Sequence, residues 1–265
     1  WSPAAAAEPA SWRGGLPRSF PYRRSLAGDE SCSGRCPRPA RPLRPNRLAV
    51  YSYAHVPWVK PVQRSFKDSD LPAPEMKLEL FQIAYETFLQ HGYRHIGMDH
   101  FALHEDELSQ ALDVGTIHRN FMRYSTRADA HQLGFGVSAI SYVGGNYFQN
   151  QKELPNYELA IQKKDLATFR GFLLSQDDLI RRHLITQIMC RGRVDWETFQ
   201  KTWKLDFKKY FANELPNLQS LIEDDLIQMN QDSFFATEVG FLFLRNIATV
   251  FDRYLNEIKN KAQNP

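Results

Sequence analysis

The sequence predicts an α/β domain followed by a domain built mostly of helices. Over residues 48–98, a β-rich apolar segment, an amphipathic helix and a second apolar segment follow one another. From about residue 172 helical periodicity takes over, and near residue 47 the composition changes abruptly. We therefore expect three parts: a head over residues 1–47, an α/β domain over residues 48–171 and a helical domain over residues 172–265.

The head is rich in arginine and proline. It contains nine arginines, no lysine, three acidic residues and eight of the 15 prolines. Such a composition favours disorder, and its contrast with the rest of the chain also raises the hypothesis of a shifted reading frame. The remainder holds 24 basic and 27 acidic residues, so it lacks the basic character of a nucleic-acid-binding protein.

Cysteine usage and apolar segments point to a cytoplasmic protein. Cys32, Cys36 and Cys190 are too few for a disulfide framework and fit a reducing compartment. Residues 1–30 contain no continuous apolar segment of the signal-peptide kind. The longest apolar stretches also fall short of the ~20 residues of a membrane-spanning helix. We expect no association with membranes.

The α/β part predicts a strand, a helix and a strand in succession. "LAVYSY" at residues 48–53 is typical of a strand, and residues 75–91 have helical periodicity that ends at Gly92. "YRHIGM" then predicts a second strand. This order favours a βαβ unit with a parallel sheet, whose ligands lie at the carboxyl ends of the strands. Asp99 and His100 are expected at one such end.

The helical part contains clear start signals and one hairpin. Ser175 is placed to cap the helix "SQDDLIRRHLITQIMC", and "DWETFQKTW" and "LPNLQSLIEDD" predict two more helices. "LIQMNQDSFFAT" predicts a hairpin, and a last helix is expected to start at Thr237 and to continue through "DRYL". Helices followed by a two-stranded wing resemble a winged-helix module. With 12 basic and 13 acidic residues from residue 172 onward, a packing role is favoured over DNA binding.

Short patterns that could hold a cofactor are weak when taken one at a time. "CSGRC" has two cysteines four residues apart, but Pro39 stands where a third cluster thiolate would be needed. "GFGVSA" fits a loose dinucleotide-binding pattern without a clear strand before it or helix after it. His118 and His131 do not have zinc-ligand spacing, so we predict structural histidines and no metal site.

Five strings, in order and spacing, resemble the oxygen-independent coproporphyrinogen III oxidases. They are "YSYAHVP", "YRHIGMDHFAL", "HRNFMRYST", "GFGVSAIS" and "NYFQNQKEL". The resemblance runs from about Asn46 to near the C-terminus. It implies the C-terminal part of a radical S-adenosylmethionine partial β/α barrel, followed by the helical, winged-helix-like domain. It further implies oxidative decarboxylation of coproporphyrinogen III to protoporphyrinogen IX, with S-adenosylmethionine and a 4Fe–4S cluster as cofactors.

The resemblance also assigns residues to the site. The alanine and isoleucine that contact S-adenosylmethionine in the family correspond here to Ala54 and Ile140. Two residues that line the active site correspond to Phe121 and Met122, where some members have glutamine at the second position. Arg123 stands where glycine is usual. No catalytic residue is assigned.

The chain departs from the family in its cysteines. The cluster-binding cysteine loop belongs to the first half of the family's barrel, and that half is not found in this sequence. We therefore expect a monomeric C-terminal fragment that is inactive alone. We also expect side chains such as Val50 and Ile96 to be partly exposed, because the strands that would cover them are absent.

Two other functions remain open. Heme chaperones of the same superfamily share the fold, but they read H-N-x-x-Y-W where residues 118–125 of this chain read HRNFMRYS. This difference favours the oxidase. The chain could instead be a non-catalytic truncated product, as the missing cysteine loop suggests.

Overall fold

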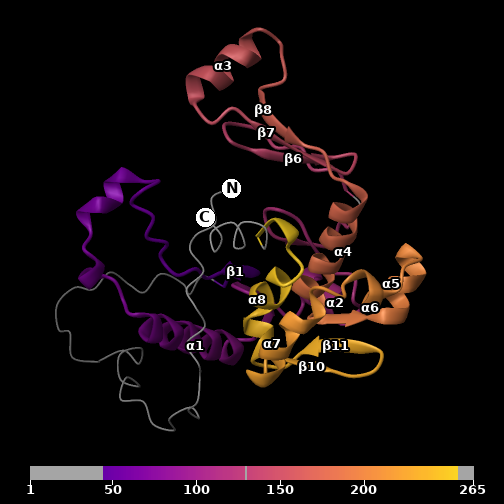
Figure 1. Cartoon of the computed structure of the whole chain (residues 1–265). Coiled ribbons are helices and arrows are strands. Elements are labelled where there is room, and N and C mark those ends of the chain that lie inside the picture. The colour runs from indigo at the N-terminus through magenta and orange to yellow at the C-terminus, as the bar shows by residue number, and fades with distance from the viewer. Residues whose placement is uncertain (1–43, 129, 256–265) are drawn as a thin grey trace, which may run out of the picture. The chain divides into compact units, whose positions relative to one another are not determined.

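The computed structural model describes residues 44–128 and 130–255 (Figure 1). Internal contacts divide the chain into two units, residues 1–46 and residues 47–265, and all described helices and strands belong to the second unit. Residues 1–43 of the predicted head, including the Cys32–Cys36 pattern, lie outside the described part, whereas Arg47 belongs to β1.

The first sheet is antiparallel, so the predicted parallel βαβ unit is wrong. Strands β1 (Arg47–Ala49), β2 (Tyr93–Gly97) and β3 (His100–Leu103) are ordered β1-β3-β2. Both outer strands pair antiparallel with β3, which lies between them. The predicted helix is confirmed as α1 (Pro74–Gln90), and the short 3-10 helices η1 (Pro61–Ser65) and η2 (Asp68–Asp70) precede it.

A tight turn after β2 explains the different sheet order. Gly97 and Met98 both have positive φ, 149° and 51°, which reverses the chain direction. A Cβ atom on Gly97 would lie 2.4 Å from the Tyr124 hydroxyl oxygen, so only glycine fits. His100 therefore begins β3, and Asp99 lies in the turn. Their predicted position at the carboxyl end of a parallel strand is wrong.

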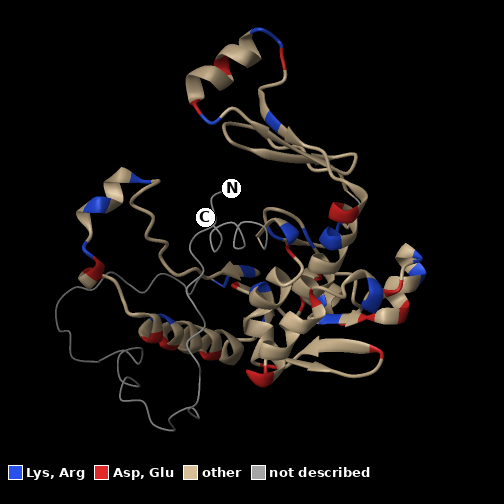
Figure 2. Ribbon diagram, viewed as in Figure 1, with Lys and Arg blue, Asp and Glu red and all other residues tan. Residues whose placement is uncertain are grey.

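A second hairpin and a three-stranded arm follow. Helix α2 (Glu107–Asp113) precedes the hairpin of β4 (His118–Arg119) and β5 (Tyr124–Ser125). The arm consists of β6 (Ile140–Val143), β7 (Asn146–Asn150), α3 (Leu154–Gln162) and β8 (Thr168–Phe172), with its strands ordered β6-β7-β8. No strand residue of the arm is buried. The only charged residue in its strands is Arg170 (Figure 2).

The helical part has the predicted helices and a three-stranded wing. Its elements are α4 (Gln176–Arg191), β9 (Arg193–Asp195), α5 (Trp196–Trp203), α6 (Phe207–Tyr210), η3 (Leu215–Leu218), α7 (Gln219–Glu223), β10 (Ile227–Met229), β11 (Ser233–Ala236), η4 (Gly240–Leu242) and α8 (Leu244–Thr249). The hairpin is confirmed as β10 and β11, and β9 extends it into the order β10-β11-β9.

Helix starts were predicted better than helix lengths. The Ser175 hydroxyl accepts a hydrogen bond from Asp178 N at 3.2 Å, as expected of an N-cap. Thr237 Oγ1 accepts from Gly240 N at 2.9 Å in the turn before η4, although the N-cap of η4 itself is Val239. The predicted last helix is not continuous: the chain forms η4 and then α8, which ends at Thr249, and residues 253–255 are helical again after a break.

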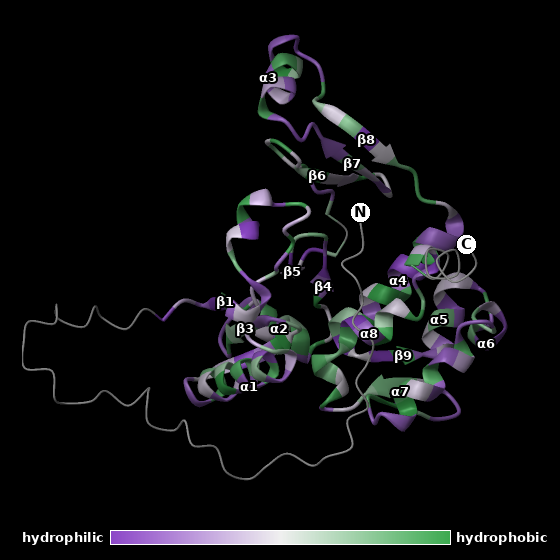
Figure 3. Ribbon diagram, turned by 60° about the vertical axis from the view of Figure 1, so that its left-hand side comes forward, coloured by the Kyte–Doolittle hydropathy of each residue, from purple (hydrophilic) through white to green (hydrophobic). Residues whose placement is uncertain are grey.

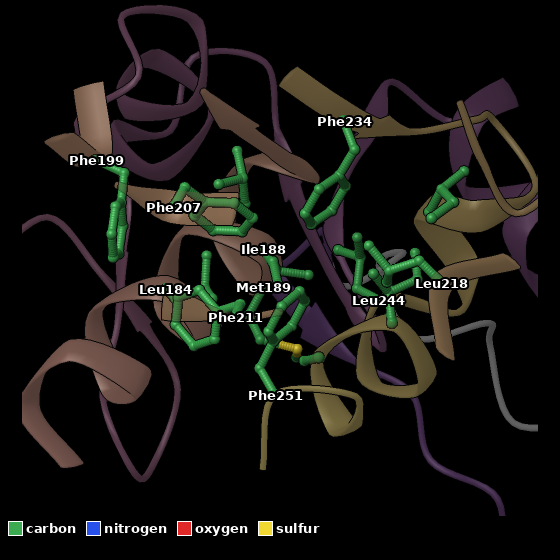
Figure 4. Close-up of a cluster of buried hydrophobic side chains, with 14 of the residues drawn as sticks. Leu184, Ile188, Met189, Phe199, Phe207, Phe211, Leu218, Phe234, Leu244 and Phe251 are labelled. Atoms are coloured by element: carbon green, nitrogen blue, oxygen red, sulfur yellow. The ribbon is translucent and has the colours of Figure 1, made fainter. Parts of the chain in front are cut away.

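The largest core lies in the helical part and is strongly aromatic. Figure 4 shows Phe207, Phe211, Phe234 and Phe251 pointing into one interior together with side chains of α4. Neighbouring ring centroids lie 5.0 Å apart for Phe207 and Phe211 and 5.2 Å apart for Phe211 and Phe251. Such contacts add to the burial of apolar area, so we expect this core to contribute most to stability.

A second core joins the α/β part to α4. It contains Ile96 and Tyr124 together with Cys190 from the last turn of α4. Ile96 is fully buried, so its predicted exposure is wrong, whereas Val50 is half-buried as expected. Ile96 of β2 and Ala102 of β3 therefore pack against Cys190 in the helical part.

An ion-pair network holds the end of the described chain to the start of α4. The Asp177 carboxylate accepts bonds from the Tyr210 hydroxyl at 2.6 Å, from Arg253 at 2.8 Å and from Arg181 at 2.9 Å. Burial alone would raise the pKa of Asp177, but these bonds outweigh it and leave the pKa below its usual value.

Among the described residues, every helix falls short of the length and apolarity that a bilayer-spanning segment requires.

Candidate functional site

The hairpin of β4 and β5 carries two of the predicted site residues at its tip. Phe121 is 40% exposed and Met122 is 66% exposed. The Asn120 side-chain oxygen accepts hydrogen bonds from the backbone N–H groups of Met122 and Arg123, each at 2.9 Å. Asparagine commonly closes turns in this way, and here it fixes the backbone that presents the two apolar side chains.

Tyr124 fastens the base of this hairpin to α4. Its ring is buried, and its hydroxyl donates to the Met189 carbonyl at 2.8 Å. The Arg119 guanidinium lies 5.7 Å from the centre of the ring. Burial raises the pKa of the Tyr124 phenol, so the group stays a neutral donor. The helical part therefore holds the hairpin in place.

The polar residues of the β2–β3 turn support the same hairpin. His100 Nδ1 lies 3.1 Å from Asp99 Oδ1, and the His100 ring lies edge-on to Tyr124 with centroids 5.3 Å apart. Burial would raise the pKa of Asp99, but the bond with His100 outweighs it and lowers the pKa. His95 Nε2 faces the Met98 carbonyl at 2.8 Å, and burial lowers the pKa of its imidazole. These histidines have structural partners.

Ala54 lies in the loop after β1, and a glutamine shapes that loop. The Gln63 side chain donates to the Ala54 carbonyl at 3.2 Å and accepts from Val56 N at 2.6 Å. One side chain from η1 thus closes the loop on both sides of His55. The small Ala54 side chain is exposed, so a ligand can approach the backbone closely there.

Ile140 is the first residue of β6 and is half-buried. The preceding loop folds back on it, since a Cβ atom on Gly134 would lie 2.8 Å from the Ile140 carbonyl oxygen. Asn150 donates to the carbonyls of Gly134 and Gly136 at 3.1 and 3.0 Å. Only glycine at position 134 permits this close approach.

The four predicted site residues lie on three separate elements. Two cavities were found elsewhere: one of about 220 Å³ beside α1, and one of about 1040 Å³ between α1, β2 and the wing. Ala54, Ile140, Phe121 and Met122 line neither of them. The structure thus places each residue on an accessible element, away from these two cavities.

The described residues do not fit a 4Fe–4S cluster. Within residues 44–128 and 130–255, no group of three or more His, Cys, Asp or Glu side chains could hold a metal ion. The one cysteine in this part is Cys190, which is buried, and burial raises the pKa of its thiol to about 12. A cluster needs thiolates, so Cys190 is unsuited to be a ligand.

Comparison with known proteins identifies the relatives. Residues 174–243 match the model of the HemN C-terminal domain. The oxygen-independent coproporphyrinogen III oxidase of Escherichia coli (strain K12) is 44% identical over 215 residues, which is 81% of this chain. The Synechocystis oxidase is 41% identical over 225 residues, or 83% of this chain. The chain is a homologue of the oxygen-independent coproporphyrinogen III oxidases.

A solved structure agrees with this assignment and confirms the fold class. The coproporphyrinogen III oxidase HemN from Escherichia coli, described as a radical SAM enzyme, matches with a TM-score of 0.76 and 43% sequence identity. The match covers 80% of this chain and 49% of the HemN chain. This oxidase homologue spans about half the length of the curated relatives it matches, 47% for Escherichia coli and 48% for Synechocystis.

Several residues that shape the site were not predicted from the sequence. Gln63, Asn120 and Tyr124 act through hydrogen bonds to backbone atoms. Asn120 carries a local signal, because asparagine often closes a turn by accepting from the backbone two or three residues on. Gln63 and Tyr124 carry no such signal, because the tertiary fold brings them to the backbone atoms that they bind.

Replacing Tyr124 by phenylalanine tests how the oxidase homologue holds its hairpin. The ring stays, but the Met189 carbonyl loses its donor, so we expect the free energy of unfolding to fall by about 1–3 kcal/mol. We also expect the ¹³C-labelled methyl signal of Met122 to shift. Urea unfolding and methyl NMR measure both effects. Tyr51→Phe is the control, since Tyr51 is 70% exposed, and an equal loss in that variant would contradict the prediction.

Proposed function

We propose that this chain acts as the C-terminal portion of an oxygen-independent coproporphyrinogen III oxidase. That enzyme converts coproporphyrinogen III to protoporphyrinogen IX by oxidative decarboxylation in heme biosynthesis. The observation that carries the proposal is the 44% identity over 215 residues to an oxidase of this name. Identity at this level extends through both the α/β part and the helical part, because it involves 81% of the chain.

In this proposal the described residues bind the organic ligands. Ala54 and Ile140 contact S-adenosylmethionine: the small alanine admits the ligand to the loop, and the isoleucine packs against its adenine ring. Phe121 and Met122 line the active site from the hairpin tip, where both are accessible. Their apolar side chains suit the pyrrole rings and alkyl groups of a porphyrinogen.

The radical reaction itself requires a group that the described residues do not hold. S-adenosylmethionine with a 4Fe–4S cluster would supply the radical in the proposed enzyme. Because no fitting donor set was found within residues 44–128 and 130–255, the proposal assigns the cluster ligands to residues outside this range. The contribution of this chain is to bind and orient S-adenosylmethionine and the porphyrinogen, and to exclude water from them.

The remaining parts of the proposal concern location and assembly. We place the protein in the cytoplasm, with one copy of this chain in each catalytic unit. Neither nucleic acid nor a membrane takes part. The three cysteines in 265 residues are compatible with a reducing compartment.

A chimeric enzyme tests the proposal. Residues 44–265 are fused behind the part of the Escherichia coli relative that the match does not include, and the product is reconstituted anaerobically with iron and sulfide. With S-adenosylmethionine and a reductant, we expect protoporphyrin to be detected by chromatography after oxidation. A chimera that holds its cluster and binds S-adenosylmethionine but forms no product would refute the proposal.

The same chimera tests Ile140. Aspartate at this position would place an unpaired charge against the adenine, so Ile140→Asp should weaken S-adenosylmethionine binding in calorimetry. Val143→Asp is the control, because Val143 lies three residues along the same strand and points to its opposite face. Equal affinities of the wild type and Ile140→Asp for S-adenosylmethionine would show that Ile140 does not contact this ligand.

A further inference from the structure

The arm of β6, β7, α3 and β8 has little packing of its own to hold it in place. None of its strand or helix residues is buried, and its central strand β7 is mostly hydrophilic (Figure 3). A segment with so few buried apolar contacts is held only weakly by its own interior. The position of Ile140, the first residue of β6, therefore depends on contacts between the arm and other elements.

One arginine of α4 contacts two tyrosines of the arm. Arg182 Nε donates to the Tyr147 hydroxyl oxygen at 2.9 Å. The guanidinium carbon of Arg182 also lies 4.2 Å from the centre of the Tyr142 ring, within the range of a cation–π contact. All three residues are half-buried, so solvent screens these contacts only in part.

The two tyrosines form one cross-strand pair. Tyr142 of β6 lies directly opposite Tyr147 of β7, and their ring centroids are 4.9 Å apart. The Tyr142 backbone is also held on its other side, because it exchanges two hydrogen bonds of 2.8 Å with Gln132. A single arginine thus holds both strands of the β6–β7 hairpin at the same level.

Ile140 lies two residues before Tyr142 on the same strand. Because side chains alternate between the two faces of a strand, Ile140 and Tyr142 lie on the same face of β6. Ile140 is paired with Gln149 in the same regular ladder that pairs the two tyrosines. A shift of Tyr142 relative to α4 would therefore move Ile140 with it.

We propose that Arg182 is a positioning residue for S-adenosylmethionine binding: it fixes the β6–β7 hairpin on α4 and thereby sets where the Ile140 side chain lies. Arg182 acts through Ile140 and does not contact the ligand. Its loss leaves the hairpin formed but loosens the attachment to α4, so that Ile140 packs less well against the ligand. The inference rests on the proposed function, in which Ile140 contacts S-adenosylmethionine.

Methyl NMR of the full chain tests the structural step alone. The δ1 methyl groups of isoleucine are labelled with ¹³C, and the Ile140 signal is assigned from its loss in Ile140→Val. Arg182→Ala should shift this signal, and Tyr147→Phe, which removes only the hydroxyl, should shift it by less. The control is Arg245→Ala, because Arg245 is exposed on α8. An Ile140 signal that is the same in Arg182→Ala and in the wild type would overturn the inference.

Calorimetry of the chimeric enzyme tests the effect on the ligand. Arg182→Ala should weaken S-adenosylmethionine binding by about two- to tenfold, the range expected for loss of one cation–π contact. Arg182→Lys should recover part of this loss, because an ammonium group can still lie over the Tyr142 ring. The urea midpoint of each variant is recorded separately. A purely structural role would lower that midpoint without changing the affinity of the folded protein, and this result would overturn the inference.

A double-mutant cycle shows whether Arg182 acts through Ile140. In an Ile140→Ala background, Arg182→Ala should weaken S-adenosylmethionine binding by less than about twofold further, because the contact that it positions is already gone. An equal loss of affinity in both backgrounds would mean that Arg182 acts independently of Ile140, which contradicts the inference.

The two measurements separate the inference from the proposed function. If Ile140→Asp binds S-adenosylmethionine weakly while Arg182→Ala binds it as the wild type does, the inference fails and the proposed role of Ile140 stands. If Ile140→Asp binds as the wild type does, the proposed role of Ile140 fails. A shifted Ile140 signal in Arg182→Ala would then still support the attachment of the hairpin to α4.

Discussion

Replacing Gly240 by alanine is expected to unfold the helical part or destabilise it by about 4 kcal/mol or more. Gly240 is buried, and a Cβ atom there would lie 1.8 Å from the Leu226 carbonyl oxygen and 2.8 Å from its carbon. Both atoms belong to the backbone, so no rotamer change relieves the clash. The carbonyl is fixed further because it accepts from Thr237 N at 3.1 Å.

Urea unfolding followed by circular dichroism measures this effect. Gly171→Ala is the control, because the nearest atom to its added Cβ would be a Phe148 side-chain carbon at 3.3 Å, which can move. We expect a change of at most about 1 kcal/mol in that variant. A Gly240→Ala protein with the unfolding midpoint of wild type would show that the turn before η4 is not packed as described.

The second large effect is expected from Phe211→Ala. Phe211 is fully buried, and its ring meets those of Phe207, Phe251 and Phe199 at centroid distances of 5.0, 5.2 and 5.7 Å. Removing it leaves a cavity in the main core, which costs about 3–5 kcal/mol. A typical domain has only about 5–15 kcal/mol of stability in total, so a large share would be lost.

The matched control is Phe135→Ala. Phe135 is 86% exposed, so its removal should change the free energy of unfolding by about 0.5 kcal/mol or less. Thermal and urea unfolding of both variants provide the comparison. Similar stabilities for the two would mean that the aromatic cluster is not the main core.

Elements with local signals were predicted well. The Ser175 cap, the helix that ends before Gly92 and the β10–β11 hairpin each depend on residues a few positions apart. The order of the first sheet was not predicted, because the glycine required at the Gly97 turn packs against Tyr124, which is distant in sequence. Ile96 was misjudged for the same reason: the residues that bury it include Cys190 on α4.

The candidate site came from resemblance rather than from physical pattern. Nothing in the periodicity near Ala54 or Ile140 distinguishes them from neighbouring residues. Their roles in binding S-adenosylmethionine remain predictions, as do those of Phe121 and Met122. Gln63 and Tyr124, which shape the segments around them, became visible only once the backbone partners were known.

The bond from Tyr124 to Met189 bears on how this protein can be divided and recombined. The family match begins at residue 174. The Met189 carbonyl in the last turn of α4, however, accepts its hydrogen bond from Tyr124, which lies before the match. The match also ends at residue 243, before Phe251 of the main core. A transplant of residues 174–243 alone would lose the donor to the Met189 carbonyl and the Phe251 ring of the main core. A portable module therefore has to include both Tyr124 and Phe251. It also has to include β1 and α1, whose residues cover Tyr93, Phe101 and Leu103, so recombination points are better placed before residue 47 and after residue 255.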